Sequence, residues 1–137
     1  MAEMDTQDAL IAVALVTAIS DDRMSDREYE EIVATVDLLP VFRGFDKKRL
    51  SGIVDIVERH MARDDGLDAF MGMVRKAVPE RLSETAYAIA CDVAAADGAV
   101  ALNEMRLLEV LRHELGLDRL NAAAIERGAR ARHMRLR

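Results

Sequence analysis

The chain has 137 residues, of which 51% are hydrophobic and 32% charged, and its net charge is −6. That length suits one domain with its own core, and the composition excludes disordered tails, collagen-like repeats and membrane proteins. The one cysteine, Cys91, cannot form an internal disulfide or a cysteine zinc site. Cysteine usage of this kind is typical of a reducing compartment, so we expect a cytoplasmic protein.

The most apolar stretch, residues 10–19, resembles neither a signal peptide nor a membrane span. A signal peptide needs positive charge ahead of its apolar segment, whereas Glu3, Asp5 and Asp8 precede this one, with no Lys or Arg. Ten residues are also too few to cross a bilayer, which takes about 20. We therefore expect no membrane insertion.

Charge is distributed unevenly along the chain. Residues 1–126 carry a net charge of −11, whereas residues 127–137 contain five Arg and no acidic residue. An acidic body repels nucleic acid and attracts cations or basic protein partners, so we expect no nucleic-acid binding. We expect the basic end to be largely exposed, and either to fold back on the acidic surface or to contact an anionic partner.

Helix-forming residues dominate and aromatic residues are only 4% of the chain, which favours an all-α fold. Apolar residues at helical spacing predict seven helices, at 6–20, 26–38, 47–63, 67–78, 84–96, 102–115 and 119–131. The predicted N-caps are Thr6, Ser25, Asp46, Ser83 and Asp118. The predicted breaks are Pro40, Gly44, Gly66, Pro79, Gly98 and Gly116. We expect one domain over residues 1–131 and a basic tail over 132–137.

An internal repeat relates two parts of the sequence. A shift of 76 residues aligns residues 12–32 with residues 88–108, so that Asp21 matches Asp97 and Glu28 matches Glu104. Each copy reads as a helix, an Asp, a hydrophobic residue three positions on, a Glu and a second helix. The repeat predicts a duplicated helical hairpin, with residues 6–38 superposing on residues 84–115 about an approximate two-fold axis.

The second copy imitates only the back half of an EF-hand loop. If Glu104 is taken as the last loop position, the first and third positions fall on Val93 and Ala95, which cannot ligate calcium. The first copy places Thr17 and Ile19 there. An EF-hand is therefore excluded, and any bound ion has to draw carboxylates from both hairpins.

The motif resembles the tellurite-resistance TerB family. It consists of an apolar helix ending in Ala-Ala-Asp-Gly at residues 95–98, then Val100 and Glu104, with an upstream copy ending in Asp21-Asp22. The resemblance implies an all-helical fold with internal pseudo-symmetry, a bacterial cytoplasmic setting, and acidic residues suspected of binding metal. Those acids are Asp21, Glu28, Asp97 and Glu104. The chain departs from the motif at Asp22, where Gly is expected.

Simpler roles compete with metal binding at these positions. Ser25 and Glu28 have the spacing of a capping box, which by itself accounts for Glu28. Asp97 can merely end a helix before Gly98. Glu104 lacks such an explanation, because the aligned cap position is Ala101, whose side chain cannot cap.

No motif for catalysis is present: the sequence has no Gly-rich phosphate loop, Ser/His/Asp signature, HExxH or CxxC. We therefore expect no enzyme, no catalytic residues and no organic cofactor.

Two functions stay open. One is a TerB-like, stress- or tellurite-resistance-associated domain that binds Ca²⁺, Mg²⁺ or Mn²⁺ through its four acids. The alternative is a metal-free helical adaptor whose acidic face docks a basic protein.

Overall fold

A computed structural model describes residues 4–20, 24–98, 100 and 102–136. Within these residues the chain forms seven α-helices and no strand, which confirms the predicted all-α class. The helices are α1 (Thr6–Ile19), α2 (Asp26–Leu38), α3 (Leu50–Met61), α4 (Gly66–Ala77), α5 (Ser83–Ala95), α6 (Leu102–Glu114) and α7 (Arg119–Arg132). Three short 3-10 helices lie in the connections, η1 (Pro40–Phe42), η2 (Lys47–Arg49) and η3 (Glu80–Leu82).

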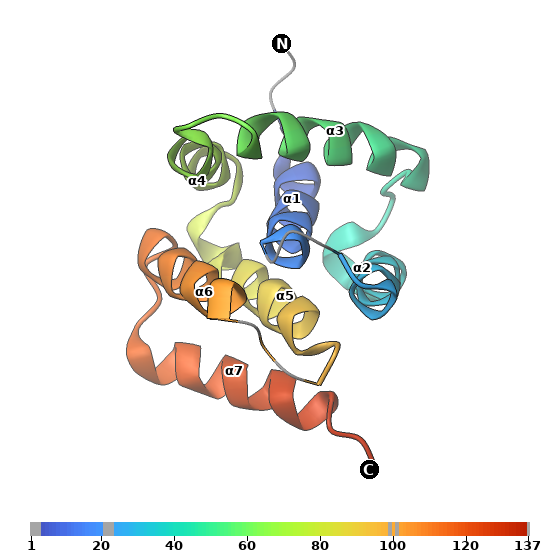
Figure 1. Cartoon of the computed structure of the whole chain (residues 1–137), viewed down its shortest axis with the longest axis vertical. Helices are drawn as coiled ribbons and strands as arrows, with labels where there is room; N and C mark the ends of the chain where they lie inside the picture. Colours follow the sequence, from blue (N-terminus) through green and yellow to red (C-terminus); the bar gives the residue numbers. More distant parts are fainter. Residues whose placement is uncertain (1–3, 21–23, 99, 101, 137) are drawn as a thin grey trace.

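Helix α1 is the centre of the fold (Figure 1). Every residue from Asp8 to Ala18 is buried, and α1 contacts each of the helices α2 to α6. A helix that is apolar on all sides is stable in water only when other elements cover its whole circumference. The apolar stretch of residues 10–19 is therefore a core helix, and no helix in the described part of the chain is long and apolar enough to cross a membrane.

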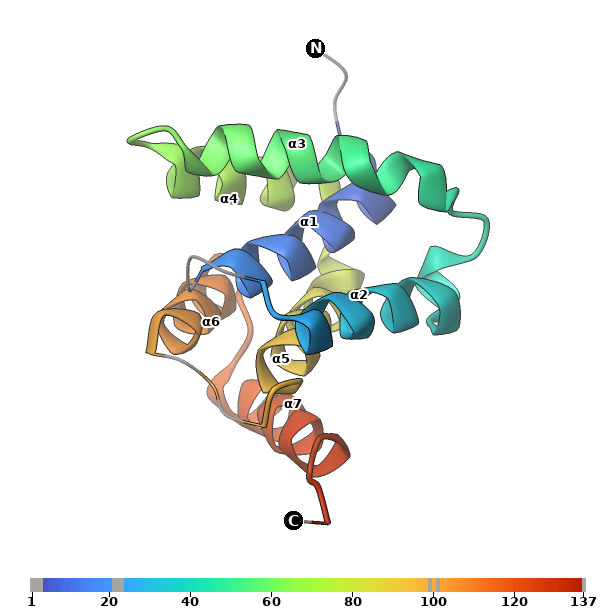
Figure 2. The same ribbon diagram turned by 45° about the vertical axis from the view of Figure 1, so that its right-hand side comes forward.

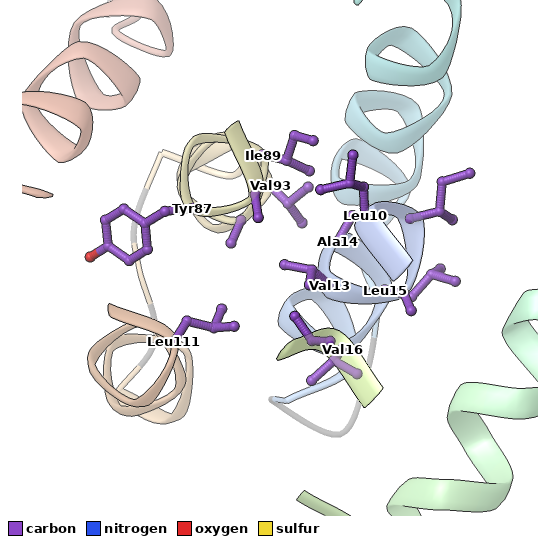
Figure 3. Packing of buried hydrophobic residues seen from close by; sticks show 14 of the residues in the cluster. Leu10, Val13, Ala14, Leu15, Val16, Tyr87, Ile89, Val93 and Leu111 are labelled. Atoms are coloured by element: carbon purple, nitrogen blue, oxygen red, sulfur yellow. The ribbon is translucent and has the colours of Figure 1, made fainter. Parts of the chain in front are cut away.

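The closest partner of α1 in the core is α5. Figure 3 shows Ile89 and Val93 of α5 directed toward Leu10 and Val13 of α1, while Tyr87 leaves α5 on a different side. Alanines such as Ala14 and Ala90 are fully or almost fully buried in the same core. Small residues let two helix backbones approach, which explains how an interior with few aromatic residues is filled.

Helices α3 and α4 lie on one side of the α1–α5 pair, and α7 lies on the other (Figures 1 and 2). Helices α3 and α4 pack against each other and against α1, whereas α7 packs on α5. The hairpin α1–α2 corresponds to α5–α6 in the repeat, and α2 contacts α5 just as α6 contacts α1. This reciprocal pattern is the one that a two-fold relation requires. Superposition of the two hairpins stays a prediction.

Two of the predicted N-caps are wrong. Asp5, and not Thr6, caps α1, and it forms a capping box with Asp8. The Thr6 hydroxyl instead donates to the Ala77 carbonyl, 2.7 Å away. Ser83 is the first residue of α5 and not its cap, because η3 runs directly into the helix and the Ser83 amide donates to Glu80. No side-chain cap is needed where a preceding turn already accepts such bonds.

The other three predicted caps are confirmed. Ser25 caps α2, Asp46 caps η2 and Asp118 caps α7, each by accepting a backbone N–H hydrogen bond. Two predicted breaks, Gly98 and Gly116, follow α5 and α6 with φ of 85° and 70°, which is left-handed backbone that favours glycine. Gly66 does not end a helix as predicted, because it is the first residue of α4.

Gly66 and Gly72 should respond in opposite ways to replacement by alanine. A Cβ at Gly66 would stand 2.0 Å from the His60 carbonyl oxygen, whereas a Cβ at Gly72 would meet nothing within 4 Å. We expect Gly66→Ala to destabilise the fold by about 1–3 kcal/mol, as overpacking does. Gly72→Ala should stabilise it by roughly 0.5–1 kcal/mol, because alanine is the better helix former. Urea unfolding of both variants tests this, and equal stability would contradict the close approach at Gly66.

Candidate functional site

The structure describes three of the four predicted ligands, and these three lie at the two repeat-related turns. Asp21 lies outside the described residues. Glu28 is in the first turn of α2, Asp97 is in the turn after α5, and Glu104 is in the first turn of α6. The placement of Glu28 and Glu104 in the same turn of the second helix of each hairpin agrees with the alignment.

Glu28 completes the predicted capping box. Its backbone N–H donates to Ser25 Oγ at 3.1 Å, and its Oε1 accepts from the Ser25 backbone N–H at 2.9 Å. The side chain is only 4% exposed. Burying a carboxylate is costly unless hydrogen bonds or positive charge compensate, and the N-terminal end of α2 supplies both. The structural role of Glu28 is therefore confirmed, whether or not it also binds an ion.

Ser25 links the two turns. Its hydroxyl donates to Asp97 Oδ1 at 3.0 Å, across 72 residues of sequence. Ser25 thus contacts Glu28 through both its backbone N–H and its hydroxyl oxygen, and the same hydroxyl donates to Asp97. The sequence identified Ser25 only as a cap, because the alignment gives no direct sign of a contact between the two copies.

Glu104 is as deeply buried as its repeat partner, with 4% of the residue exposed. Like Glu28, it lies where the partial positive charge of a helix N-terminus stabilises a carboxylate. Among the residues that the structure describes, no three Asp, Glu, His or Cys side chains form a group that could hold a metal ion. Because Asp21 is outside those residues, the four-carboxylate site stays a prediction.

A groove of about 570 Å³ lies beside these turns, between the exposed face of α2 and the C-terminal segment. It is lined by Asp26, Arg27, Glu30, Glu31, Ala34, Ala96 and His133. Burial raises the pKa of the Glu31 carboxyl, and the neighbouring His133 opposes that shift. We call this surface the acidic groove. In the sequence its acids are part of a charge run typical of a solvated helix face, and no local pattern indicates a groove there.

The basic tail takes the first of its two predicted alternatives, since it folds back on the acidic body. Arg132 donates to Asp92 Oδ1 from Nε at 3.1 Å and from Nη2 at 2.7 Å, and Arg135 donates to the Ala96 carbonyl. His133 Nε2 lies 3.4 Å from Asp92 Oδ1. Residues 134–136 are exposed, as expected.

Cys91 has no features of a nucleophile. It is buried in α5, and burial, together with the negative charge of Glu126, raises the pKa of its thiol to about 12. A thiol reacts as its thiolate, so this environment suppresses its chemistry. Cys91 is a core residue, as its position on the apolar side of the helix indicates.

Comparisons of the chain with protein-family models, with curated proteins and with solved structures found no match. The resemblance to TerB therefore rests on the repeated motif of the sequence alone.

The hydrogen bond between Ser25 and Asp97 should be measurable as an energetic coupling. We expect Ser25→Ala to cost about 0.5–2 kcal/mol, because it removes the α2 cap as well as this bond. In a double-mutant cycle with Asp97→Ala, the two substitutions should couple by roughly 0.5–1 kcal/mol. Asp118→Ala is the control, because it removes the cap of α7 at a distant site and should be additive with Asp97→Ala. Additivity of the Ser25 and Asp97 substitutions would mean that the bond contributes nothing.

The Cys91 thiol should resist alkylation in the folded protein. The rise in its pKa from 9.0 to about 12 lowers the thiolate fraction at pH 8 roughly a thousandfold. Reaction with iodoacetamide at pH 8 should therefore be slow in buffer and fast in 6 M guanidinium, with mass spectrometry as the readout. Fast labelling of the native protein would show that α5 opens readily or that the thiol is accessible.

Proposed function

We propose that this chain is a TerB-like domain that binds a divalent cation at its two paired turns, with a role in stress or tellurite resistance in the cytoplasm. The observation that carries the proposal is the Ser25–Asp97 hydrogen bond, because it joins the turn of the second hairpin to that of the first. The matching burial of Glu28 and Glu104 supports it. We propose no catalytic role.

The donor chemistry of the proposed site fits a hard cation. Asp21, Glu28, Asp97 and Glu104 offer only carboxylate oxygens, which Ca²⁺, Mg²⁺ and Mn²⁺ prefer to softer ligands. Carboxylates brought together repel one another, and a cation relieves that repulsion. The bonds to Ser25 engage Oε1 of Glu28 and Oδ1 of Asp97. We assign the second oxygen of each carboxylate to the cation.

The second candidate function is a metal-free adaptor that docks a basic protein. The acidic groove favours it, because three carboxylates line the groove next to a C-terminal segment whose arginines already bind acidic and carbonyl groups of the body. The metal-binding domain predicts a rise in melting temperature on addition of a cation and the adaptor predicts none, so one set of melting curves distinguishes them.

A divalent cation should raise the melting temperature of the chain. Binding to the folded form alone adds about 2.7 kcal/mol at a hundredfold excess over the dissociation constant, which corresponds to a rise of about 10 °C for a chain of this size. Differential scanning fluorimetry with Ca²⁺, Mg²⁺ and Mn²⁺, each against EDTA, measures this shift.

Substitutions at the two turns test which residues bind the ion. Glu104→Gln keeps the side-chain shape but removes the charge, so it should abolish the cation-dependent rise. Glu28→Gln should also reduce it, and its EDTA melt should change little because Gln can complete a capping box. Glu84→Gln, an exposed acid in the first turn of α5, is the matched control. If no cation moves the wild-type melt, the metal proposal fails and the adaptor replaces it.

A further inference from the structure

The acidic groove has carboxylates arranged to receive a planar cation. Asp26 and Glu30 lie one helical turn apart on α2, so their side chains share one face of the helix, and both residues are exposed. Glu31 adds a third carboxylate to the lining, whereas Arg27 is the one lysine or arginine among the lining residues. The groove therefore keeps an excess of negative charge.

The chain's own C-terminal segment shows which chemistry the surface in and next to the groove accepts. Arg135 reaches the carbonyl of Ala96, a residue of the groove lining, and Arg132 binds Asp92 beside the groove through two nitrogens. His133 lines the groove and lies 3.9 Å from Glu31 Oε1. The arginine contacts are on the α5 side of the groove, and on the α2 side only Glu31 is contacted, so Asp26 and Glu30 are left to another group.

We propose that the acidic groove binds an arginine-bearing segment of another protein, and that the segment of residues 132–136 competes with it for the same surface. The inference rests on the second candidate function and names its ligand. Arginine fits better than lysine because its guanidinium is planar and donates several N–H bonds in fixed directions, so that it can bridge two carboxylates or add a carbonyl. Charge complementarity identifies the ligand class, since three carboxylates line the groove and guanidinium groups of the same chain bind the Ala96 carbonyl and the adjoining Asp92.

The tail competes with an incoming segment because His133 and Arg135 already contact residues of the groove lining. An incoming segment that reaches Glu31 and the Ala96 carbonyl has to displace His133 and Arg135 from them. The tail contacts are exposed, with Arg132 retaining 55% of its side-chain accessibility in its ion pair with Asp92. Exposed ion pairs are weak and screened by salt, so an external ligand can replace them.

The test uses the full-length chain and a labelled peptide, RGARARHMRL, with the sequence of residues 127–136. Fluorescence anisotropy in EDTA at about 50 mM salt, where screening is moderate, measures its affinity independently of any cation site. A variant carrying Arg132→Gln and Arg135→Gln weakens the internal competitor. We expect this released variant to bind the peptide roughly twofold to fivefold more tightly than wild type. A change of that size corresponds to the free energy of one exposed ion pair that the peptide no longer has to displace.

Variants of the groove complete the test. In the released background, Glu30→Gln with Glu31→Gln should weaken binding at least roughly fivefold. Glu58→Gln with Glu84→Gln, two exposed acids on α3 and α5, changes the net charge equally and should leave the affinity unchanged. Equal losses in the two double variants, or equal affinities of the wild-type and released chains, would overturn the inference.

A second peptide separates this inference from the adaptor function. It has lysine in place of every arginine, so it keeps the charge and loses the guanidinium geometry. We expect weaker binding than for the arginine peptide. Equal binding of both peptides would overturn the inference but preserve an adaptor for basic proteins. If neither peptide binds to the released variant, both the inference and the adaptor function fail.

Discussion

The structure depends on one constraint, which is that α1 has no polar side to present to water. Its residues from Asp8 to Ala18 are buried, so helices must surround it, and α2 to α6 all do. Beyond the first turn of the helix, Thr17 is the one buried residue with a polar side chain, and its hydroxyl donates to the Val13 carbonyl within the same helix. At the N-terminal end, Asp8 pairs with Arg49, which fixes η2 and the start of α3 against α1. The helix is thus covered by apolar residues and anchored at its end by charge.

The same constraint places the candidate site. Because α1 and α5 pack against each other and α2 contacts α5, the start of α2 comes within hydrogen-bond distance of the residues that follow α5. Ser25 and Asp97, which the sequence separates by 72 positions, thereby share one region of the surface. The acidic groove begins at the same place, since Asp26 and Ala96 both line it. A cation at the turns and a basic segment in the groove would therefore act on neighbouring surfaces.

Helix number and most helix ends could be predicted because they depend on local signals. The period of apolar residues, the Ser25 and Asp118 caps and the glycines after α5 and α6 all act within a few residues. The prediction failed at Thr6 and Ser83. The side chain of Asp5, the residue before Thr6, caps α1, and η3 accepts the Ser83 N–H at the start of α5. The Ser25–Asp97 bond and the fold-back of Arg132 onto Asp92 are long-range contacts that no local pattern specifies. Glu28 and Glu104 were found through the repeat, but only the structure shows that both are buried.

The burial of α1 also sets a condition on how the chain matures during translation. Residues 6–19 are made before their main partner α5, which begins 64 positions after α1 ends. At synthesis rates of 5–20 residues per second, the nascent helix waits about 3 to 13 s before synthesis of α5 begins. During that interval its apolar surface can associate with other chains or with a chaperone. The helix at the centre of the finished core is thus the one that needs protection while the ribosome is still at work.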